Sequence, residues 1–233
     1  MRFKKTAAFL GATALVILGG PAVAGPNHTV AVGGNSSGTV YNVTGTSKGA
    51  VTFVVNGVNM GCTGATAAGT IDSGALTAPV APDTLGEDVA VLATTTWTGC
   101  IGPGGLAMTV TQSSAWCLYL NPYSQASTAP LTNVFNGVIK NCNGTAVMAN
   151  VKDTATNGAI CNFNVQGRAV GSFNEAAKAN GTQDLTVAEP GTNLTVSGVA
   201  GCLGAITNGN GASFNGVYNV DTNGPGNRDI NIF

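Results

Sequence analysis

The chain has 233 residues, of which 44% are hydrophobic and only 8% are Asp, Glu, Lys or Arg, whereas roughly a quarter of the residues in an ordinary soluble domain are charged. The hydrophobic share is sufficient for a core and excludes wholesale disorder. The 34 glycines follow no regular period, which excludes a collagen-like fold.

The first 24 residues have the three parts of a secretory signal peptide. These parts are the basic residues Arg2, Lys4 and Lys5, the apolar run 7–18, and the small residues Ala22-Val23-Ala24. Removal of this segment leaves six basic and ten acidic residues, a net charge of 6 − 10 = −4. We therefore expect no nucleic-acid partner, which would require clustered Lys and Arg, and no membrane insertion.

The rest of the chain alternates short β-branched or aromatic runs with turns rich in Gly, Asn and Pro, a pattern typical of antiparallel sheets. The predicted strands are 39–44, 50–55, 89–97, 106–111, 115–120, 134–140, 146–151, 160–165, 185–187, 194–199 and 214–220. We expect hairpin turns at 45–49 and 141–144. The segment 62–85 is interpreted as a long surface loop with one short strand near Ile71. Only 173–178 has a helical composition.

These elements predict an all-β fold, an antiparallel β-sandwich or a small barrel of about a dozen short strands with three disulfides. We assign residues 25–48 to a flexible N-terminal segment or an edge strand. Residues 49–220 form the β-sandwich domain, and residues 221–233 form a C-terminal tail.

Six cysteines follow the leader, an even number that is typical of a disulfide framework in an exported protein. They are Cys62, Cys100, Cys117, Cys142, Cys161 and Cys202. Their spacing alone leaves the pairing open. The chain contains no Cys-x-x-Cys pair and its single histidine is His28, so neither a zinc site nor a thioredoxin-type site is predicted.

Three stretches resemble a group of uncharacterised secreted all-β proteins of actinobacteria. They are Trp97-Thr98-Gly99-Cys100 with Gly102-Pro103, then Trp116-Cys117-Leu118, and finally Gly201–Ile206 with Phe214–Tyr218. The resemblance extends over 61–220 and implies an all-β fold without any assigned activity. It also implies that Cys62 pairs with Cys100 and Cys161 with Cys202. Cys117 and Cys142 depart from the family pattern and would form an additional bridge, which requires Cα atoms within about 7 Å of each other.

The titratable residues predict no catalytic site. A hydrolase needs a nucleophile with a positioned base or a pair of carboxylates, and we expect His28 to be exposed near the start of the mature chain. Glu87 and Asp88, with Asp83, are a candidate cation site, but adjacent acids on a strand point to opposite faces. We interpret them as solvated residues, and we predict no enzyme activity, metal or other cofactor.

The candidate ligand-binding residues are Trp97, Trp116, Tyr119 and Tyr123, since exposed aromatic rings on β-domains can stack on sugar rings. Core packing is the alternative for the two tryptophans. The leading functional interpretation is a secreted or cell-wall-associated structural or surface protein without catalytic activity, able to self-assemble through edge strands. The alternative is an extracellular binding module for a glycan or a small apolar ligand. Cell-wall glycan or lipid is then the candidate partner, outside the cell or in its envelope.

Overall fold

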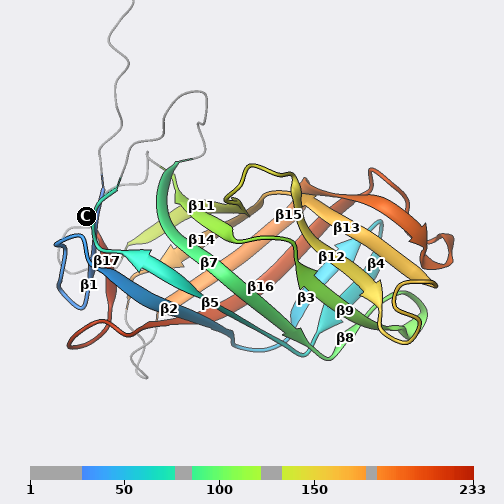
Figure 1. Cartoon of the computed structure of the whole chain (residues 1–233), viewed down its shortest axis with the longest axis horizontal. Helices are drawn as coiled ribbons and strands as arrows, with labels where there is room; N and C mark the ends of the chain where they lie inside the picture. The colour runs from blue at the N-terminus through green and yellow to red at the C-terminus, as the bar shows by residue number, and fades with distance from the viewer. Residues whose placement is uncertain (1–27, 77–85, 122–132, 177–182) are drawn as a thin grey trace, which may run out of the picture.

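The structure is a computed structural model that describes residues 28–76, 86–121, 133–176 and 183–233 (Figure 1). It confirms the all-β fold. The strands are β1 (Thr29–Val32), β2 (Val40–Ser47), β3 (Val51–Val55), β4 (Val58–Cys62), β5 (Gly64–Asp72), β6 (Gly74–Ala75), β7 (Glu87–Thr98), β8 (Cys100–Ile101), β9 (Ala107–Gln112), β10 (Trp116–Leu120), β11 (Val134–Asn141), β12 (Val147–Asp153), β13 (Cys161–Gly167), β14 (Ala169–Asn174), β15 (Gln183–Gly201), β16 (Gly211–Thr222) and β17 (Ile230–Ile232), with two short 3-10 turns at Pro103–Gly105 and Cys202–Gly204.

Fourteen of these strands form one closed antiparallel barrel. Many of these strands are successive parts of one longer strand, because two consecutive elements pair with the same neighbouring strand. β2 and β3 both pair with β16, and β13 and β14 both pair with β15. The pairs β4–β5, β7–β8, β9–β10 and β11–β12 continue in the same way. Six such continuous strands, with β15 and β16, make a meander of 6 + 2 = 8 long strands. β16 closes the ring by pairing with β15 on one side and β2–β3 on the other.

Two predicted hairpins are wrong for this reason. The segment 45–49 does not reverse the chain, because β2 and β3 run in the same direction along β16. The segment 141–144 likewise joins β11 to β12 within one long strand, beside β14 and β13. The Gly, Ser and Asn residues that predict turns at these places lie at interruptions within long strands.

The predicted surface loop at 62–85 is also wrong for its first part. Gly64–Asp72 forms β5, which pairs with β2 and β7. Its inward positions include Ala65 and Ala67, which are too small to give the hydrophobic alternation from which strands are recognised. Gly69 permits a β-bulge there, because a Cβ on it would lie 1.8 Å from the Val91 carbonyl oxygen. Residues 77–85 lie outside the described part of the chain.

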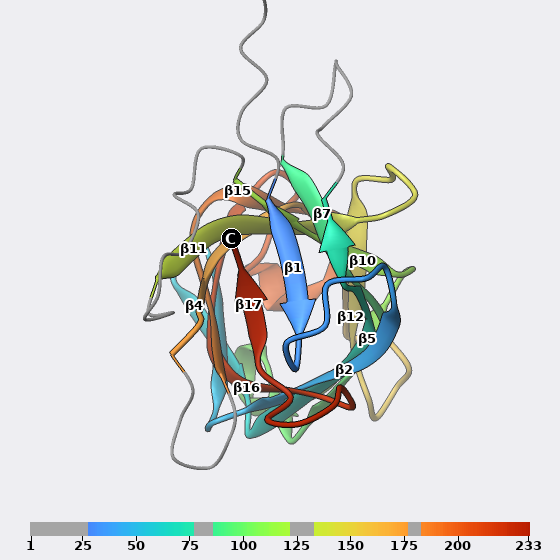
Figure 2. The same cartoon turned by 90° about the vertical axis from the view of Figure 1, so that its left-hand side faces the viewer.

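A three-stranded sheet in the order β17-β1-β6 lies across one end of the barrel (Figure 2). This placement differs from the flexible or edge segment expected at 25–48, since β1 pairs on both sides and β2 belongs to the barrel. The expected tail at 221–233 contains β17. Buried side chains of this small sheet, Val30 and Ile232 among them, pack against Leu120 and Phe135 of the barrel. We call β1, β6 and β17 the end sheet.

Buried polar contacts hold the end sheet in place. The expectation of an exposed His28 is wrong, because its side chain is 0% exposed and its Nδ1 lies 2.6 Å from Glu87 Oε2. On the opposite side, the Gln183 amide donates to the Ile230 carbonyl and accepts from the Ile230 N–H. The Glu175 carboxylate accepts the N–H of Ile232. These buried contacts satisfy groups that would otherwise be costly to remove from water.

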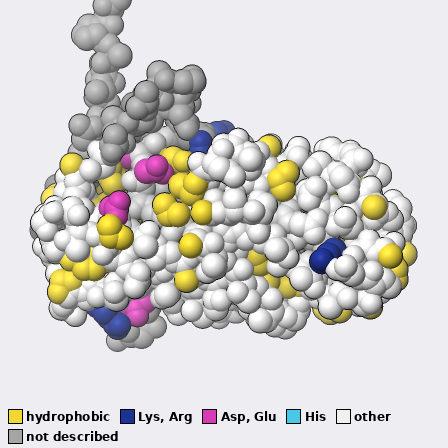
Figure 3. Space-filling model, in the orientation of Figure 1, with side chains coloured by type: hydrophobic (Ala, Val, Ile, Leu, Met, Phe, Trp, Pro, Cys, Tyr) yellow, Lys and Arg dark blue, Asp and Glu magenta, His cyan; other side chains and the backbone are white. Residues whose placement is uncertain are grey.

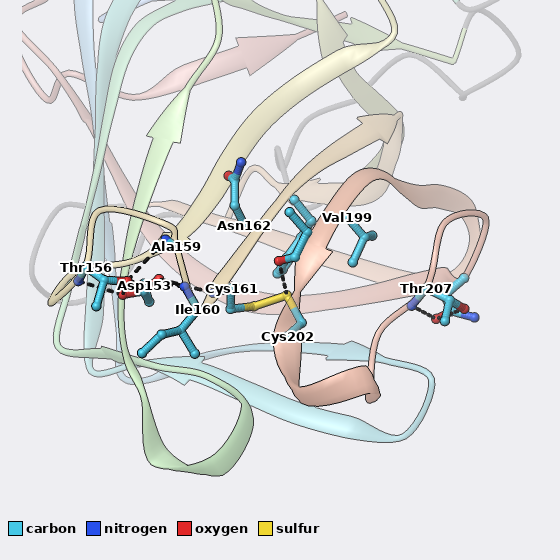
Figure 4. The surroundings of a disulfide bond; sticks show 12 residues. Asp153, Thr156, Ala159, Ile160, Cys161, Asn162, Val199, Cys202 and Thr207 are labelled. Carbon is cyan, nitrogen blue, oxygen red and sulfur yellow. Dashed lines mark hydrogen bonds between the residues drawn. A yellow bond between two sulfur atoms is a disulfide. The ribbon is translucent and has the colours of Figure 1, made fainter.

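Three disulfides connect neighbouring long strands or the turns beside them, in the pairing that the resemblance implies. Cys62 pairs with Cys100, Cys117 with Cys142, and Cys161 with Cys202. The Cα atoms of Cys117 and Cys142 are 5.0 Å apart, inside the required limit. Beside the third bridge, the Asp153 carboxylate accepts the backbone N–H groups of Ile160 and Cys161 (Figure 4).

The face of the barrel shown in Figure 3 carries few charged side chains, and its hydrophobic side chains are scattered among uncharged polar groups and backbone. Outward positions on the long strands are exposed Asn and Thr, for example Asn42, Thr44 and Thr46 on β2. Most apolar side chains of the same strands point inward, as the period of two requires, although a few, Val40 of β2 and Val134 of β11 among them, are exposed. None of the described residues belongs to a helix long and apolar enough to cross a membrane.

Candidate functional site

The interior of the barrel contains a cavity of about 220 Å³. Its lining is mostly aliphatic and aromatic, and it extends to Ile230 and Ile232 of the end sheet. A dry, apolar cavity of roughly 150 Å³ is enough to bind benzene, whereas drug-sized ligands occupy pockets of roughly 300 Å³ or more. The cavity therefore has the volume for one small organic molecule.

Small residues on opposite walls create this space. Gly45 of β2 lies opposite Ala67 of β5, while Gly137 of β11 and Gly171 of β14 lie opposite each other in the facing wall. An ideal Cβ on Gly45 would be 3.9 Å from the Ala67 Cβ, an ordinary contact distance, so backbone crowding does not require a glycine here. The interior of an eight-stranded barrel is just wide enough to be filled by side chains or to hold one small ligand. Here the small residues leave space for a ligand.

Both candidate tryptophans face the cavity. The ring centroids of Trp97 and Trp116 are 5.7 Å apart, with planes inclined at 55°. Trp116 Nε1 donates to the Met148 carbonyl oxygen at 3.1 Å. These rings form part of the interior wall, so they do not make an aromatic platform on the outer surface.

Of the two candidate tyrosines, Tyr119 is among the residues that border the cavity, but its side chain does not join the tryptophan pair. Tyr119 lies opposite Val138 of β11, on the other face of β10 from Trp116 and Leu118. Lys140 Nζ stands 4.7 Å from the centroid of the Tyr119 ring, and the two residues are partly exposed together. Tyr123 lies outside the described residues.

Tyr218 is a cavity residue that sequence reasoning did not select. It lies on β16 and lines the cavity, and burial raises the pKa of its hydroxyl to about 12. The alternation Phe214, Gly216, Tyr218, Val220 places it on one face of the closing strand. That pattern could have identified it as an inward residue, but the size of the space in front of it depends on other strands.

No side chain in the cavity lining is charged: the described lining contains neither Asp, Glu, Lys, Arg nor His. The acids that are buried elsewhere are bound by the chain itself. Glu189 accepts the N–H groups of Gly191, Thr192 and Asn193, and although burial acts to raise its pKa, these donors lower it overall. Across the described ranges, His, Cys, Asp and Glu form no group of three that could hold a metal ion.

Comparison of the chain with protein-family models, curated proteins and solved structures finds no match. The resemblance to secreted actinobacterial proteins therefore stays a prediction.

Proposed function

We propose that the protein binds one small apolar molecule inside the barrel, without catalysis. The cavity of about 220 Å³ between the Gly45–Ala67 wall and the Gly137–Gly171 wall carries this proposal. Filling such a space with an apolar ligand removes apolar surface from water at both partners, which is the dominant favourable term in this kind of binding. Of the ligand classes considered from the sequence, the apolar one fits this lining better than a glycan, which needs several polar partners.

Barrel closure argues for binding over assembly through strand edges. Each of the eight long strands is hydrogen-bonded on both sides, and closure of this kind removes the unpaired edges through which sheets associate. Within the described ranges, the outer strands of the end sheet are the short β6 and β17. A structural or surface role would therefore need contacts other than strand pairing.

We propose an extracellular location for this activity. Three disulfides are typical of proteins in oxidising compartments, and the predicted signal peptide supports export. In that setting the barrel would shield an apolar molecule from water outside the cell or within its envelope.

Mass spectrometry tests the proposal. The protein is purified from the medium of its own secreting cells and extracted with organic solvent. We expect a neutral apolar compound in the wild-type extract that is depleted from Ala67→Phe, where the new ring fills the cavity. Ala68→Phe is the matched control, because Ala68 is the exposed neighbour on β5. Equal recovery of the same compounds from all three proteins would contradict an interior site.

A further inference from the structure

The hydroxyl of Tyr218 has no hydrogen-bond partner among the described residues. The ring lies over Gly216, and the hydroxyl oxygen is 3.4 Å from the point where a Cβ on Gly216 would be. Its surroundings are the apolar side chains of the larger core cluster. Tyr218 is partly buried and its hydroxyl oxygen is not fully covered, so a polar atom in the cavity can reach it. A tyrosine hydroxyl that is largely removed from water normally has a hydrogen-bond partner.

Three other polar groups in the cavity wall differ from Tyr218. Trp116 Nε1 already donates to Met148. Thr95 Oγ1 has no partner either, but its atom is fully covered and cannot be reached from the cavity without a rotation of the side chain. Trp97 Nε1 in the same lining also has no hydrogen-bond partner among the described residues, but an indole N–H can only donate. The Tyr218 hydroxyl can both donate and accept, so it is the group that suits either an alcohol or a carbonyl oxygen of a ligand.

The strand register places Tyr218 beside open space. Tyr218 lies opposite Ser47, whose hydroxyl accepts the Ala65 N–H, and Ala65 lies opposite Trp97. Tyr218 and Trp97 thus lie beside the small residues Gly45, Ala65 and Ala67 of β2 and β5. The Tyr218 Cβ is 3.9 Å from the ideal Cβ position of Gly45, so no bulky side chain separates the ring from these small residues.

The cavity lining also favours an uncharged ligand. With no charged side chain in the described lining, an ion would lose its hydration without gaining a counter-charge, which is far more costly than burying a neutral hydroxyl or carbonyl. The raised pKa of Tyr218 fits these surroundings, since burial is its cause. The phenol therefore stays neutral at ordinary pH and can donate a hydrogen bond to a ligand oxygen.

We propose that the ligand is an uncharged, mainly apolar molecule with one hydrogen-bonding oxygen, an alcohol or a carbonyl, which pairs with the Tyr218 hydroxyl. This inference rests on the proposed function and specifies its ligand class. The apolar part of the molecule lies over Gly45, Ala65 and Ala67 and against the ring of Trp97.

Three eight-carbon probes test the inference: octane, 1-octanol and octanoate at pH 8. Each probe displaces the neutral fluorophore N-phenyl-1-naphthylamine, whose binding is followed through quenching of tryptophan emission. The variant is Tyr218→Phe, which removes only the oxygen. Its matched control is Tyr41→Phe, because Tyr41 lies outside the cavity lining and its hydroxyl accepts a hydrogen bond from the Asn35 amide.

We expect Tyr218→Phe to lower the affinity for 1-octanol by about three- to tenfold, which corresponds to the loss of one net hydrogen bond. The affinity for octane should not change. In the wild type, octanoate should bind more than about tenfold less tightly than 1-octanol. Tyr41→Phe should change none of these affinities. Thermal unfolding of both variants establishes that they are folded.

Two results would overturn the inference while leaving the proposed function in place. One is octane binding in the wild type with equal effects of Tyr218→Phe on octane and 1-octanol. The other is octanoate binding as tightly as 1-octanol. Failure of all three probes to displace the fluorophore from the wild type would contradict the proposed function itself, and this inference with it.

Discussion

Trp97 on β7 and Trp116 on β10 place their rings 5.7 Å apart inside the barrel, against the same cavity. They are the two tryptophans of the chain. Tryptophan emission therefore reports on the interior alone. We expect blue-shifted emission that iodide in the water quenches weakly, because both rings are turned away from the outer surface. Quenching as efficient as that of free tryptophan amide would contradict their interior placement.

The buried contact between His28 and Glu87 at the end sheet should contribute measurably to stability. His28→Ala removes the imidazole from the Glu87 carboxylate, which is 1% exposed and then keeps the backbone N–H of residue 28 as a donor. We expect a loss of about 3 kcal/mol in the free energy of unfolding, measured by urea denaturation. Hydrogen exchange should rise first in β1 and β17.

The double variant His28→Ala/Glu87→Ala is the control for this pair. Removing both partners should cost less than the sum of the two single changes, since no charge is then left buried. Additive effects would show that the two side chains do not interact.

Asp153 should make the stability of the folded state depend on pH in the acid range. The Thr156 hydroxyl and the N–H groups of Thr156, Cys161 and Ile160 lower its pKa, against the opposing effect of burial. A lowered pKa means that the folded state binds this proton less readily than the unfolded chain, so the stabilisation is present above the ordinary pKa of 3.8 and is lost as the pH falls below it.

Asp153→Asn separates this contribution from the rest of the chain. We expect a lower thermal midpoint than the wild type at pH 7, and a difference between the two that narrows below about pH 4. If the difference in thermal midpoint between the wild type and Asp153→Asn stayed constant down to the acid transition, the Asp153 carboxylate would not be the source of the pH dependence.

Tyr218 should titrate at a higher pH than an ordinary tyrosine. Its pKa of about 12 lies above the ordinary value of 10.0 because the ring is buried. The folded state therefore resists this ionisation, and the corresponding stability is present below pH 10 and lost as the pH rises towards 12. Ultraviolet difference spectra should show a late step that Tyr218→Phe lacks. A single step near pH 10 in the wild type would contradict its burial.

Local patterns predicted the strands of this fold better than they predicted their connections. The alternation in Trp116–Leu120 and in the closing strand placed the correct side chains inside. It identified only the end of β5, near Ile71, because Ala65 and Ala67 give no hydrophobic alternation. The same small residues create the cavity, so one feature of the sequence concealed most of β5 and the candidate site together.

The remaining differences come from distant parts of the chain. Whether Ser47-Lys48-Gly49 reverses the chain or only interrupts a long strand depends on the neighbouring strand, and here β16 pairs with both sides of the interruption. His28 is buried because Glu87, 59 residues away, pairs with its ring. No local pattern contains that information.

The central claim is that the barrel interior is a binding site, and titration with N-phenyl-1-naphthylamine tests it most directly. Quenching of tryptophan emission is measured for the wild type, Ala67→Phe and Ala68→Phe, with Ala67→Leu as a milder filling variant. We predict saturable binding of one molecule per chain to the wild type and to Ala68→Phe, and affinity at least about tenfold lower in both Ala67 variants, because the added carbons occupy the cavity. Equal affinity in all four folded proteins, or no saturable quenching in the wild type, would contradict an interior site.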